Sequence, residues 1–293
     1  PSGPRISDGD LLYGGDMDQW RLFANSLRLR MAMRLSEVAP GLAATEVADA
    51  ISAGVFTSSD DGAILHFLDN GVDVHPIFGY ERNRDDHSIS ATLVDSLKSF
   101  NDPRLPIYAR PNQAGEYVGT PHGDADNPPL AQVSRIGTYF SSAATPAVIL
   151  SYAEVLFLRA EAAERGWAPG AAGDLYAEAI TATMTDVGVP AADIATYLAQ
   201  PSVQYQGGEA GLNQIWFQKW ISLYGNGPEA YAEWRRTGVP HLEPGPDAIN
   251  DGLIPVRLPY PDRELSLNAQ AVQAAMARQG GATLNSPVWW DVR

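Results

Sequence analysis

Residues 16–38 read DMDQWRLFANSLRLRMAMRLSEV and carry the clearest helical periodicity in the chain. Apolar side chains recur there every three or four residues, the spacing of an amphipathic helix, and predict a core-facing stripe of Trp20, Phe23, Ala24, Leu27, Met31, Leu35 and Val38. Asp16 or Asp18 suits the start of this helix and Pro40-Gly41 its end. A shorter helix, expected over residues 45–53 and ending at Gly54, completes a helical hairpin over residues 16–53.

Further helical hairpins are predicted over residues 148–238. The first joins residues 149–163 to residues 171–186 through the turn GWAPG, and the second joins a helix around Trp216 to one that Pro228 opens and Gly238 closes. Because one hairpin cannot bury its own faces, such units predict stacking like that of tetratricopeptide repeats. The strict consensus of those repeats is matched poorly, so we expect divergent units.

The remaining parts of the chain are irregular in pattern. Residues 57–146 are rich in Asp, Asn, Gly and Pro, and only residues 90–100 favour a helix. Loops of this length are usually functional or disordered, and recurring aromatic residues favour order here. The C-terminal extension, residues 239–293, is expected to hold a short edge strand at 254–258, a helix at 268–279 and a terminus pinned by Trp289 and Trp290. The prediction is a mainly α fold of divergent tetratricopeptide-like helical hairpins with a long irregular loop insertion, in a single domain over residues 1–293.

Composition excludes several classes of function. The 293 residues carry a formal net charge of −15, which would repel a phosphate backbone and disfavours nucleic acid as a partner. The absence of cysteine excludes disulfides, thiolate metal sites and cysteine nucleophiles. No stretch approaches the roughly 18 to 20 apolar residues that a membrane span needs. The chain begins at Pro1 without an initiator Met, so we expect a processed or partial chain.

The motifs of common active sites are missing from the sequence. It contains no Gly-x-Ser-x-Gly elbow, no phosphate-binding glycine loop and no His-Glu-x-x-His pair. The five histidines stand apart, so no metal site and no cofactor are predicted. The acidic pairs Asp60-Asp61 and Asp85-Asp86 could suggest glycoside hydrolysis, but adjacent acids in Asp- and Asn-rich loops are more often turn residues. The expected protein has no catalytic residues.

A series of short strings runs through most of the chain in a fixed order. They are LYGGD at 12–16, WxxFANSLxLRxAxR at 20–34, NDPRLP at 101–106, YxG at 117–119, YAEVxFLRAEA at 152–162, QKWI at 218–221, EWRRTGxP at 233–240, IPxRxxYP at 254–261 and WWD at 289–291. These strings resemble the SusD/RagB family of glycan-binding surface lipoproteins, which pair with TonB-dependent transporters in Bacteroidetes-type bacteria.

The resemblance implies an arrangement for the whole protein. This chain would be the C-terminal part of the family's full length, preceded by a lipid-bearing cysteine and a first set of helices. The protein would lie on the extracellular face of the outer membrane, touching the membrane only through a lipid anchor absent from this chain. Its helical units would pack against a SusC-like TonB-dependent transporter, and its loop insertion would face an oligosaccharide or similar nutrient.

Glycan binding without catalysis needs aromatic rings for stacking and planar polar groups for hydroxyls, displayed on loops above a rigid scaffold. Residues 57–146 supply both, and the predicted ligand-binding residues are Phe78, Tyr80, Arg82, Asp85, His87, Tyr108 and Tyr117. These aromatic residues could instead fill a small core beneath the loops. The tryptophans of the helices (Trp20, Trp216, Trp220 and Trp234) are expected in the core, and the strings at 102–104 and 234–237 are expected to hold the fold.

Two other functions stay open at this point. The stacked hairpins would also suit a tetratricopeptide-like scaffold that binds only another protein and has no glycan affinity. A helical glycosidase would depend on Asp85 or Asp86 and would release reducing ends from a polysaccharide.

Overall fold

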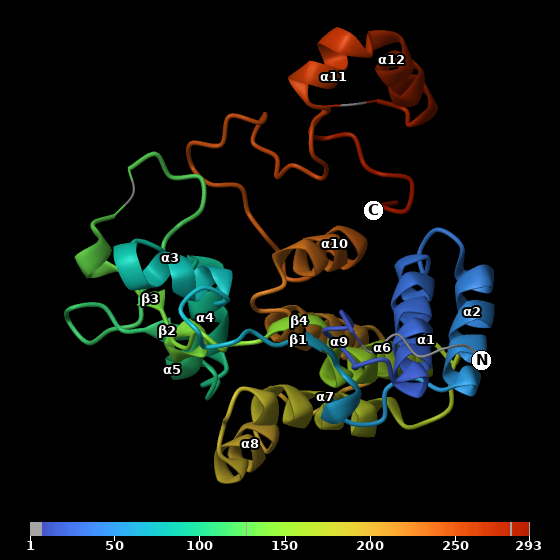
Figure 1. Ribbon diagram of the computed structural model, residues 1–293, viewed down its shortest axis with the longest axis horizontal. Coiled ribbons are helices and arrows are strands. Elements are labelled where there is room, and N and C mark those ends of the chain that lie inside the picture. Colours follow the sequence, from blue (N-terminus) through green and yellow to red (C-terminus); the bar gives the residue numbers. More distant parts are fainter. Residues whose placement is uncertain (1–7, 127, 282, 293) are drawn as a thin grey trace.

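The computed structural model describes residues 8–126, 128–281 and 283–292, and this part of the chain is mainly helical (Figure 1). Three helical hairpins form its frame: α1 (Met17–Arg34) with α2 (Pro40–Ala53), α6 (Tyr152–Glu164) with α7 (Ala172–Asp186), and α9 (Gly208–Ser222) with α10 (Gly227–Thr237). The short helix α8 (Ala191–Leu198), which the sequence did not predict, connects α7 to α9. The predicted mainly α fold with tetratricopeptide-like hairpins is confirmed.

Helix α6 lies at the centre of the frame and contacts α1, α7 and α9. One side of it, including Leu156, Phe157 and Ala160, belongs to a core cluster with α7 and α8. Another side, including Val155 and Leu158, belongs to a cluster shared with α1 and α2. A helix buried on both sides explains why its sequence is apolar all round rather than on one stripe.

The N-terminal cap of α1 was predicted better than its buried face. Asp16 caps the helix by accepting hydrogen bonds from the backbone N–H groups of Asp18 and Gln19. The fully buried side chains are Ser26, Leu29, Ala32 and Met33, whereas Met31, which we expected in the core, is 63% exposed. The predicted stripe was partly wrong. Because α1 packs against both α2 and α6, its buried face differs from the face that the stripe covers.

The boundary between α1 and α2 was also predicted wrongly. Pro40 opens α2 rather than following α1 as a stop signal, and α2 begins five residues before the predicted start at 45. Proline is favoured in the first turn of a helix, where its missing N–H would have no partner anyway. The predicted stop at Gly54 is confirmed.

The insertion over residues 57–146 is closed at its base by strand pairing. Strand β1 (Ala63–Leu65) pairs antiparallel with β4 (Ala147–Leu150), and inside the insertion β2 (Ala109–Arg110) pairs with β3 (Arg135–Ile136). The insertion also holds α3 (Pro76–Arg84), α4 (Ala91–Ser99), α5 (Leu105–Tyr108) and the 3-10 turns Ser59–Asp61, Leu130–Gln132 and Thr138–Phe140. The predicted helix at 90–100 is confirmed as α4, but the expectation of a single helix was wrong, since α3 is a second one of nine residues.

A core of its own supports the insertion on the frame. Ile89, Leu93, Val94, Leu97, Tyr108 and Ala109 cluster there with Ile221 of α9. The ion pair of Asp102 and Arg104 is fully buried beside this core, and Arg104 donates a 2.8 Å hydrogen bond to Gln218 of α9. The string at 102–104 is therefore a structural clamp between the insertion and the frame.

The C-terminal extension carries α11 (Asp262–Leu267) and α12 (Ala269–Arg278), drawn in red at the top of Figure 1. Helix α12 confirms the prediction at 268–279, but the predicted strand at 254–258 is wrong because that segment forms no strand. Trp290 lies under the guanidinium groups of Arg34 and Arg235 and ties the terminus to the frame, whereas Trp289 is 70% exposed. Among the described helices, none has both the length and the apolar character needed to traverse a bilayer.

Candidate functional site

Helix α3 forms one wall of an open cleft on the insertion. The His75 ring accepts a hydrogen bond from the backbone N–H of Ile77 at 3.2 Å, and Pro76 occupies the first turn, so the helix begins with both start signals. Phe78, Arg82 and Asp85 follow one another at four- and three-residue spacing and line the cleft together. The sequence predicted these three side chains as ligand-binding residues, and the structure brings them to one surface.

The opposite wall comes from β2, β3 and the residues that follow β3. It consists of Arg110, Ile136, Gly137, Thr138, Phe140 and Ser141. Glu81 adds to the α3 wall, and the cleft has a volume of about 370 Å³. This volume falls within the range of small-molecule sites. No sequence signal pointed to this wall, because its residues lie more than twenty positions from α3 and come beside it only through the β2–β3 pairing.

The charged groups of the cleft are arranged as ion pairs. Arg110 forms an ion pair with Asp85 and donates to the carbonyl oxygen of Ile136 at 2.7 Å. Arg135 lies 3.3 Å from the same carboxylate and donates to the carbonyl of His87. The neighbouring acid, Asp86, is paired with Arg84 at 2.7 Å. Both carboxylates of the Asp85-Asp86 pair are thus held by guanidinium groups.

Tyr80 and His87 lie beside the cleft rather than in its lining. The Tyr80 side chain is 64% exposed, and its ring meets the His87 ring edge-on at 6.4 Å between centroids. His87 also contacts the carboxylate of Glu81. An exposed aromatic ring provides a surface on which a sugar can stack.

The last two predicted residues are placed differently. Tyr108 is only 1% exposed and stacks on Tyr224 with ring centroids 4.2 Å apart. Tyr117 is half-buried and packs against the core of the insertion. The alternative that some aromatic residues fill a small core under the loops describes these two, and they are not part of the open cleft.

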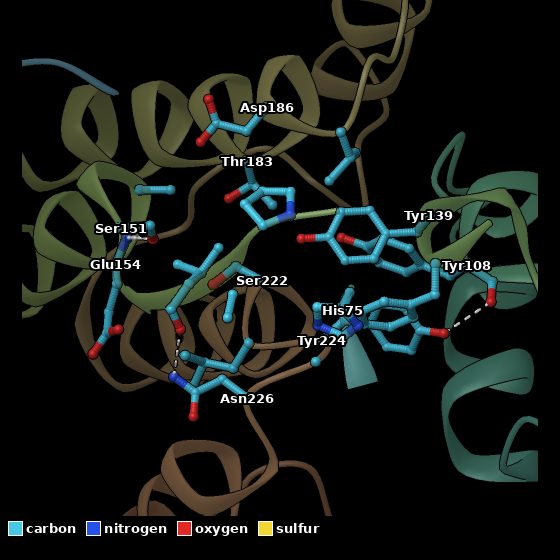
Figure 2. Close-up of a pocket in the computed structure, with 18 residues that line it drawn as sticks. His75, Tyr108, Tyr139, Ser151, Glu154, Thr183, Asp186, Ser222, Tyr224 and Asn226 are labelled. Atoms are coloured by element: carbon cyan, nitrogen blue, oxygen red, sulfur yellow. Dashed lines mark hydrogen bonds between the residues drawn. The ribbon is translucent and has the colours of Figure 1, made fainter. Parts of the chain in front are cut away.

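Tyr108 instead lines an enclosed cavity of about 140 Å³ between the insertion and the frame, which the sequence did not predict (Figure 2). Tyr108, Tyr139 and Tyr224 gather at one side of this cavity, and Ser151 and Glu154 lie at the other (Figure 2). Figure 2 also shows the Tyr224 hydroxyl donating to the carbonyl of Tyr108 at 3.0 Å.

Burial shifts the pKa values of several groups of the enclosed cavity in the direction that favours their neutral forms. It raises the pKa of the Tyr108, Tyr139 and Tyr224 phenols, lowers the pKa of His75 and raises the pKa of Asp186, where a hydrogen bond from Ser59 acts in the opposite direction. A space of this size has room for a few water molecules but not for an oligosaccharide. The open cleft is therefore the better candidate for a ligand site.

Comparison with known proteins agrees with this architecture. Residues 2–261 match a family model described as starch-binding and associating with the outer membrane. No curated protein matches the chain. Among solved structures, a chitin-binding protein is 34% identical over the whole chain with a TM-score of 0.88, and the match covers 68% of that protein.

Two further structures show the same relation. A chitin-binding SusD homologue from Flavobacterium johnsoniae is 30% identical with a TM-score of 0.86, over 97% of this chain and 66% of that one. A SusD-like protein from Bacteroides thetaiotaomicron is 28% identical with a TM-score of 0.85, again over 97% of this chain and 66% of that one. The match to the family model over most of the chain, together with these structures, shows that the protein belongs to the SusD-like family.

Proposed function

We propose that this protein binds an extracellular oligosaccharide in the cleft beside α3 without cleaving it, and that chitin-type chains of N-acetylglucosamine are its first candidate ligand. The observation that carries the proposal is the convergence of Phe78, Arg82 and Asp85 on one open cleft. Tyr80 is a further exposed ring on the same helix. Aromatic rings stack on the apolar faces of sugars, and guanidinium and carboxylate groups bind hydroxyl and amide groups in the plane of the ring. Two chitin-binding proteins of the same fold support the choice of ligand.

The non-catalytic role rests on the ion pairs of Asp85 in the cleft and of Asp86 beside it. A glycosidase needs two carboxyl groups facing the scissile bond, one of them able to donate a proton. Asp85 is shared between Arg110 and Arg135, and Asp86 is bound by Arg84. These pairs favour a structural and ligand-orienting role for both carboxylates.

Delivery to a transporter is the second part of the proposal. The family description associates its members with the outer membrane, and we propose that the protein works on the extracellular face and passes its ligand to a SusC-like TonB-dependent transporter. A scaffold that binds only the transporter remains the competing function, and glycan affinity separates the two.

Titration calorimetry of the chain with chito-oligosaccharides tests the binding site. Phe78→Ala, Tyr80→Ala and Arg82→Ala should each weaken binding, with Phe78→Ala losing about ten-fold, since an aromatic contact contributes on the order of 1 kcal/mol beyond its buried area. Trp289→Ala is the matched control, because this ring is also exposed but lies in the C-terminal extension. Far-UV circular dichroism verifies that each variant keeps its helices.

The same experiment distinguishes the alternatives. Equal affinity in all three variants and wild type would remove the cleft from the proposal. An absence of affinity for chitin and for other neutral glycans, combined with capture of a TonB-dependent transporter, would favour the protein-binding scaffold. Release of reducing ends that stops in Asp85→Asn or Asp86→Asn would establish a glycosidase instead.

A further inference from the structure

Three potential metal ligands meet at the C-terminal end of α3, outside the set of residues proposed to stack on sugars. The helix ends at Arg84, and Asp85 adopts the left-handed conformation with φ 43°. This turn reverses the chain, so that Asp86 and His87 return beside Glu81 in the last turn of the helix. One ligand atom from each of Glu81, Asp86 and His87 lies within 4.8 Å of the other two.

The individual contacts place these atoms around one point. His87 Nδ1 contacts Glu81 Oε1 and lies 3.6 Å from Asp86 Oδ1. A tetrahedral zinc ion lies about 2.0 to 2.2 Å from nitrogen and oxygen ligands, so its ligand atoms stand about 3.3 to 3.6 Å apart. The distance of 3.6 Å between His87 Nδ1 and Asp86 Oδ1 fits this geometry. A cation between His87 and Glu81 requires these two side chains to move apart, and the exposed His87 ring has room to do so.

A second observation points to a missing partner at Glu81. Its side chain is only 12% exposed, and its Oε2 atom is buried without a hydrogen-bond partner among the described residues. A buried carboxylate oxygen without a partner is costly, and in native structures it usually indicates water or an ion. A cation held by both oxygens of Glu81 would satisfy this atom.

The surrounding cations leave the three ligand atoms available. Arg84 binds Asp86 through Oδ2, so Oδ1 stays directed toward His87. Arg110 and Arg135 are engaged with Asp85 rather than with Glu81. The His87 side chain is 55% exposed, which lets a cation enter from solvent and keep water molecules in its remaining positions.

We propose that Glu81, Asp86 and His87 bind one divalent transition-metal cation, with Zn²⁺ as the ion of choice. One imidazole nitrogen and two carboxylates suit Zn²⁺, whereas Ca²⁺ and Mg²⁺ prefer sites made of oxygen alone. The bound cation would hold the end of α3 against the segment that follows it. Ser88 in that segment forms an antiparallel β-bridge with Arg135 of β3. The proposal goes beyond the glycan-binding function and does not depend on it.

Calorimetric titration of Zn²⁺ into the chain, prepared without a polyhistidine tag and treated with EDTA, tests the site. Wild type should bind one equivalent of Zn²⁺, which mass spectrometry of the metal content after gel filtration would verify. Glu81→Gln and His87→Ala should each weaken binding at least about ten-fold, since even supporting residues of a metal site contribute that much. His241→Ala is the matched control, because His241 is exposed and paired with a carboxylate, Glu243, at 2.6 Å.

Each other result overturns the proposal. It fails when wild type takes up no Zn²⁺, when both ligand variants keep full affinity, or when His241→Ala loses as much affinity as they do. An equal or tighter isotherm with Ca²⁺ would overturn the assignment to a transition metal. Asp86→Asn, nearly the same size as the native residue, provides a third ligand variant if circular dichroism shows that either of the others is unfolded. Chito-oligosaccharide titrations in EDTA test the proposed function separately, so one can fail without the other.

Discussion

Arg236 lies at the centre of a buried group of charged side chains in the frame. Its guanidinium lies 2.7 Å from Glu161 of α6, contacts Glu233 one turn earlier in α10, and donates to the Ser36 hydroxyl at 2.9 Å. All three charged side chains are 1% exposed or less. A buried group of ion pairs adds little net stability compared with apolar side chains of similar volume in the same place. Removing only one of the charged side chains is costly, because the remaining charges stay buried.

Replacing Arg236 by Met should therefore destabilise the protein severely. Glu161 would keep Arg165 at 3.0 Å and Glu233 would keep Lys219 at 3.1 Å, but both would lose their shared buried cation, and we expect the free energy of unfolding to fall by about 3 kcal/mol. Urea denaturation followed by circular dichroism measures the change. Arg28→Met is the control, since Arg28 also pairs with two acids but does so in water at 39% exposure. A loss as large in the control would contradict the special role of the buried group.

Helix α3 shows how an element can carry a site without a strong sequence signal. Its nine residues, PIFGYERNR, contain a glycine and no fully buried side chain, so no apolar stripe distinguishes it from a loop. The helix starts with the signals of His75 and Pro76. Without an apolar stripe, the sequence predicted Phe78, Arg82 and Asp85 as ligand-binding residues but described their backbone as irregular.

Gly137 of the cleft and Gly79 of α3 should respond in opposite ways to alanine. A Cβ atom at Gly137 would lie 2.3 Å from the carbonyl oxygen of Ile107 and 2.6 Å from the backbone nitrogen of Ala109, so Gly137→Ala must push β2 and β3 apart. We expect a loss of about 1–3 kcal/mol of stability and weaker glycan binding. A Cβ atom at Gly79 meets only Val74 at 3.6 Å, and Gly79→Ala should stabilise by about 0.5–1 kcal/mol because alanine loses less backbone freedom in a helix.

Thermal unfolding of the two variants measures this difference directly. Hydrogen exchange adds a local readout, since Gly79→Ala should increase protection within α3. Equal melting temperatures for both variants would contradict the close approach of Gly137 to the backbone of Ile107 and Ala109.

Across the whole molecule, buried ion pairs join the helices of different hairpins. Arg30 of α1 binds Glu154 of α6 at 2.6 Å, Arg34 of α1 binds Glu229 of α10, and Arg236 of α10 binds Glu161 of α6. Burial alone would raise the pKa of Glu161 and Glu233, but the Arg236 guanidinium outweighs it and holds both pKa values below the ordinary 4.5. Glu229 behaves in the opposite way, because burial and then the nearby Glu154 raise its pKa.

These shifts predict acid-sensitive stability. A carboxyl group whose pKa is lower in the folded state stabilises fully above its unfolded pKa and loses that contribution as pH falls toward the folded value. Glu161, Glu233 and Asp10, whose pKa the Trp20 hydrogen bond lowers to about 2, act in this direction. Glu229 and Asp186 act against them at low pH, since their raised pKa values favour the protonated folded form, whereas Asp61, whose pKa is lowered by hydrogen bonds from Thr57 and Ser58, acts with them.

We therefore expect the melting temperature to fall steadily from about pH 5 to about pH 3. Circular dichroism melts over this range measure the effect, and Arg236→Met should flatten the curve because it removes the cation that lowers two of the pKa values. A melting temperature that rises on acidification would show that the groups with raised pKa values dominate.

Local signals determined a large part of this protein. The helical spacing of apolar residues, the Asp16 cap, the Gly54 and Gly238 stops and Pro228 are short-range signals, and they predicted the hairpins of the frame. The ordered strings between residues 12 and 291 predicted the family to which the chain belongs. Such signals are reliable because caps and periodicity act within one or two turns of the chain.

Tertiary structure alone decided which faces are buried and which residues meet. Met31 is exposed because α6 takes up another side of α1, and Tyr108 is buried because the insertion folds onto Tyr224 of the frame. The cleft depends on Arg110 and residues 136–141 reaching α3 through strand pairing, and the cluster of Glu81, Asp86 and His87 depends on the left-handed turn at Asp85. Contacts between residues far apart in sequence produce no short-range sequence signal, because they depend on complementary shape and charge on two separate segments.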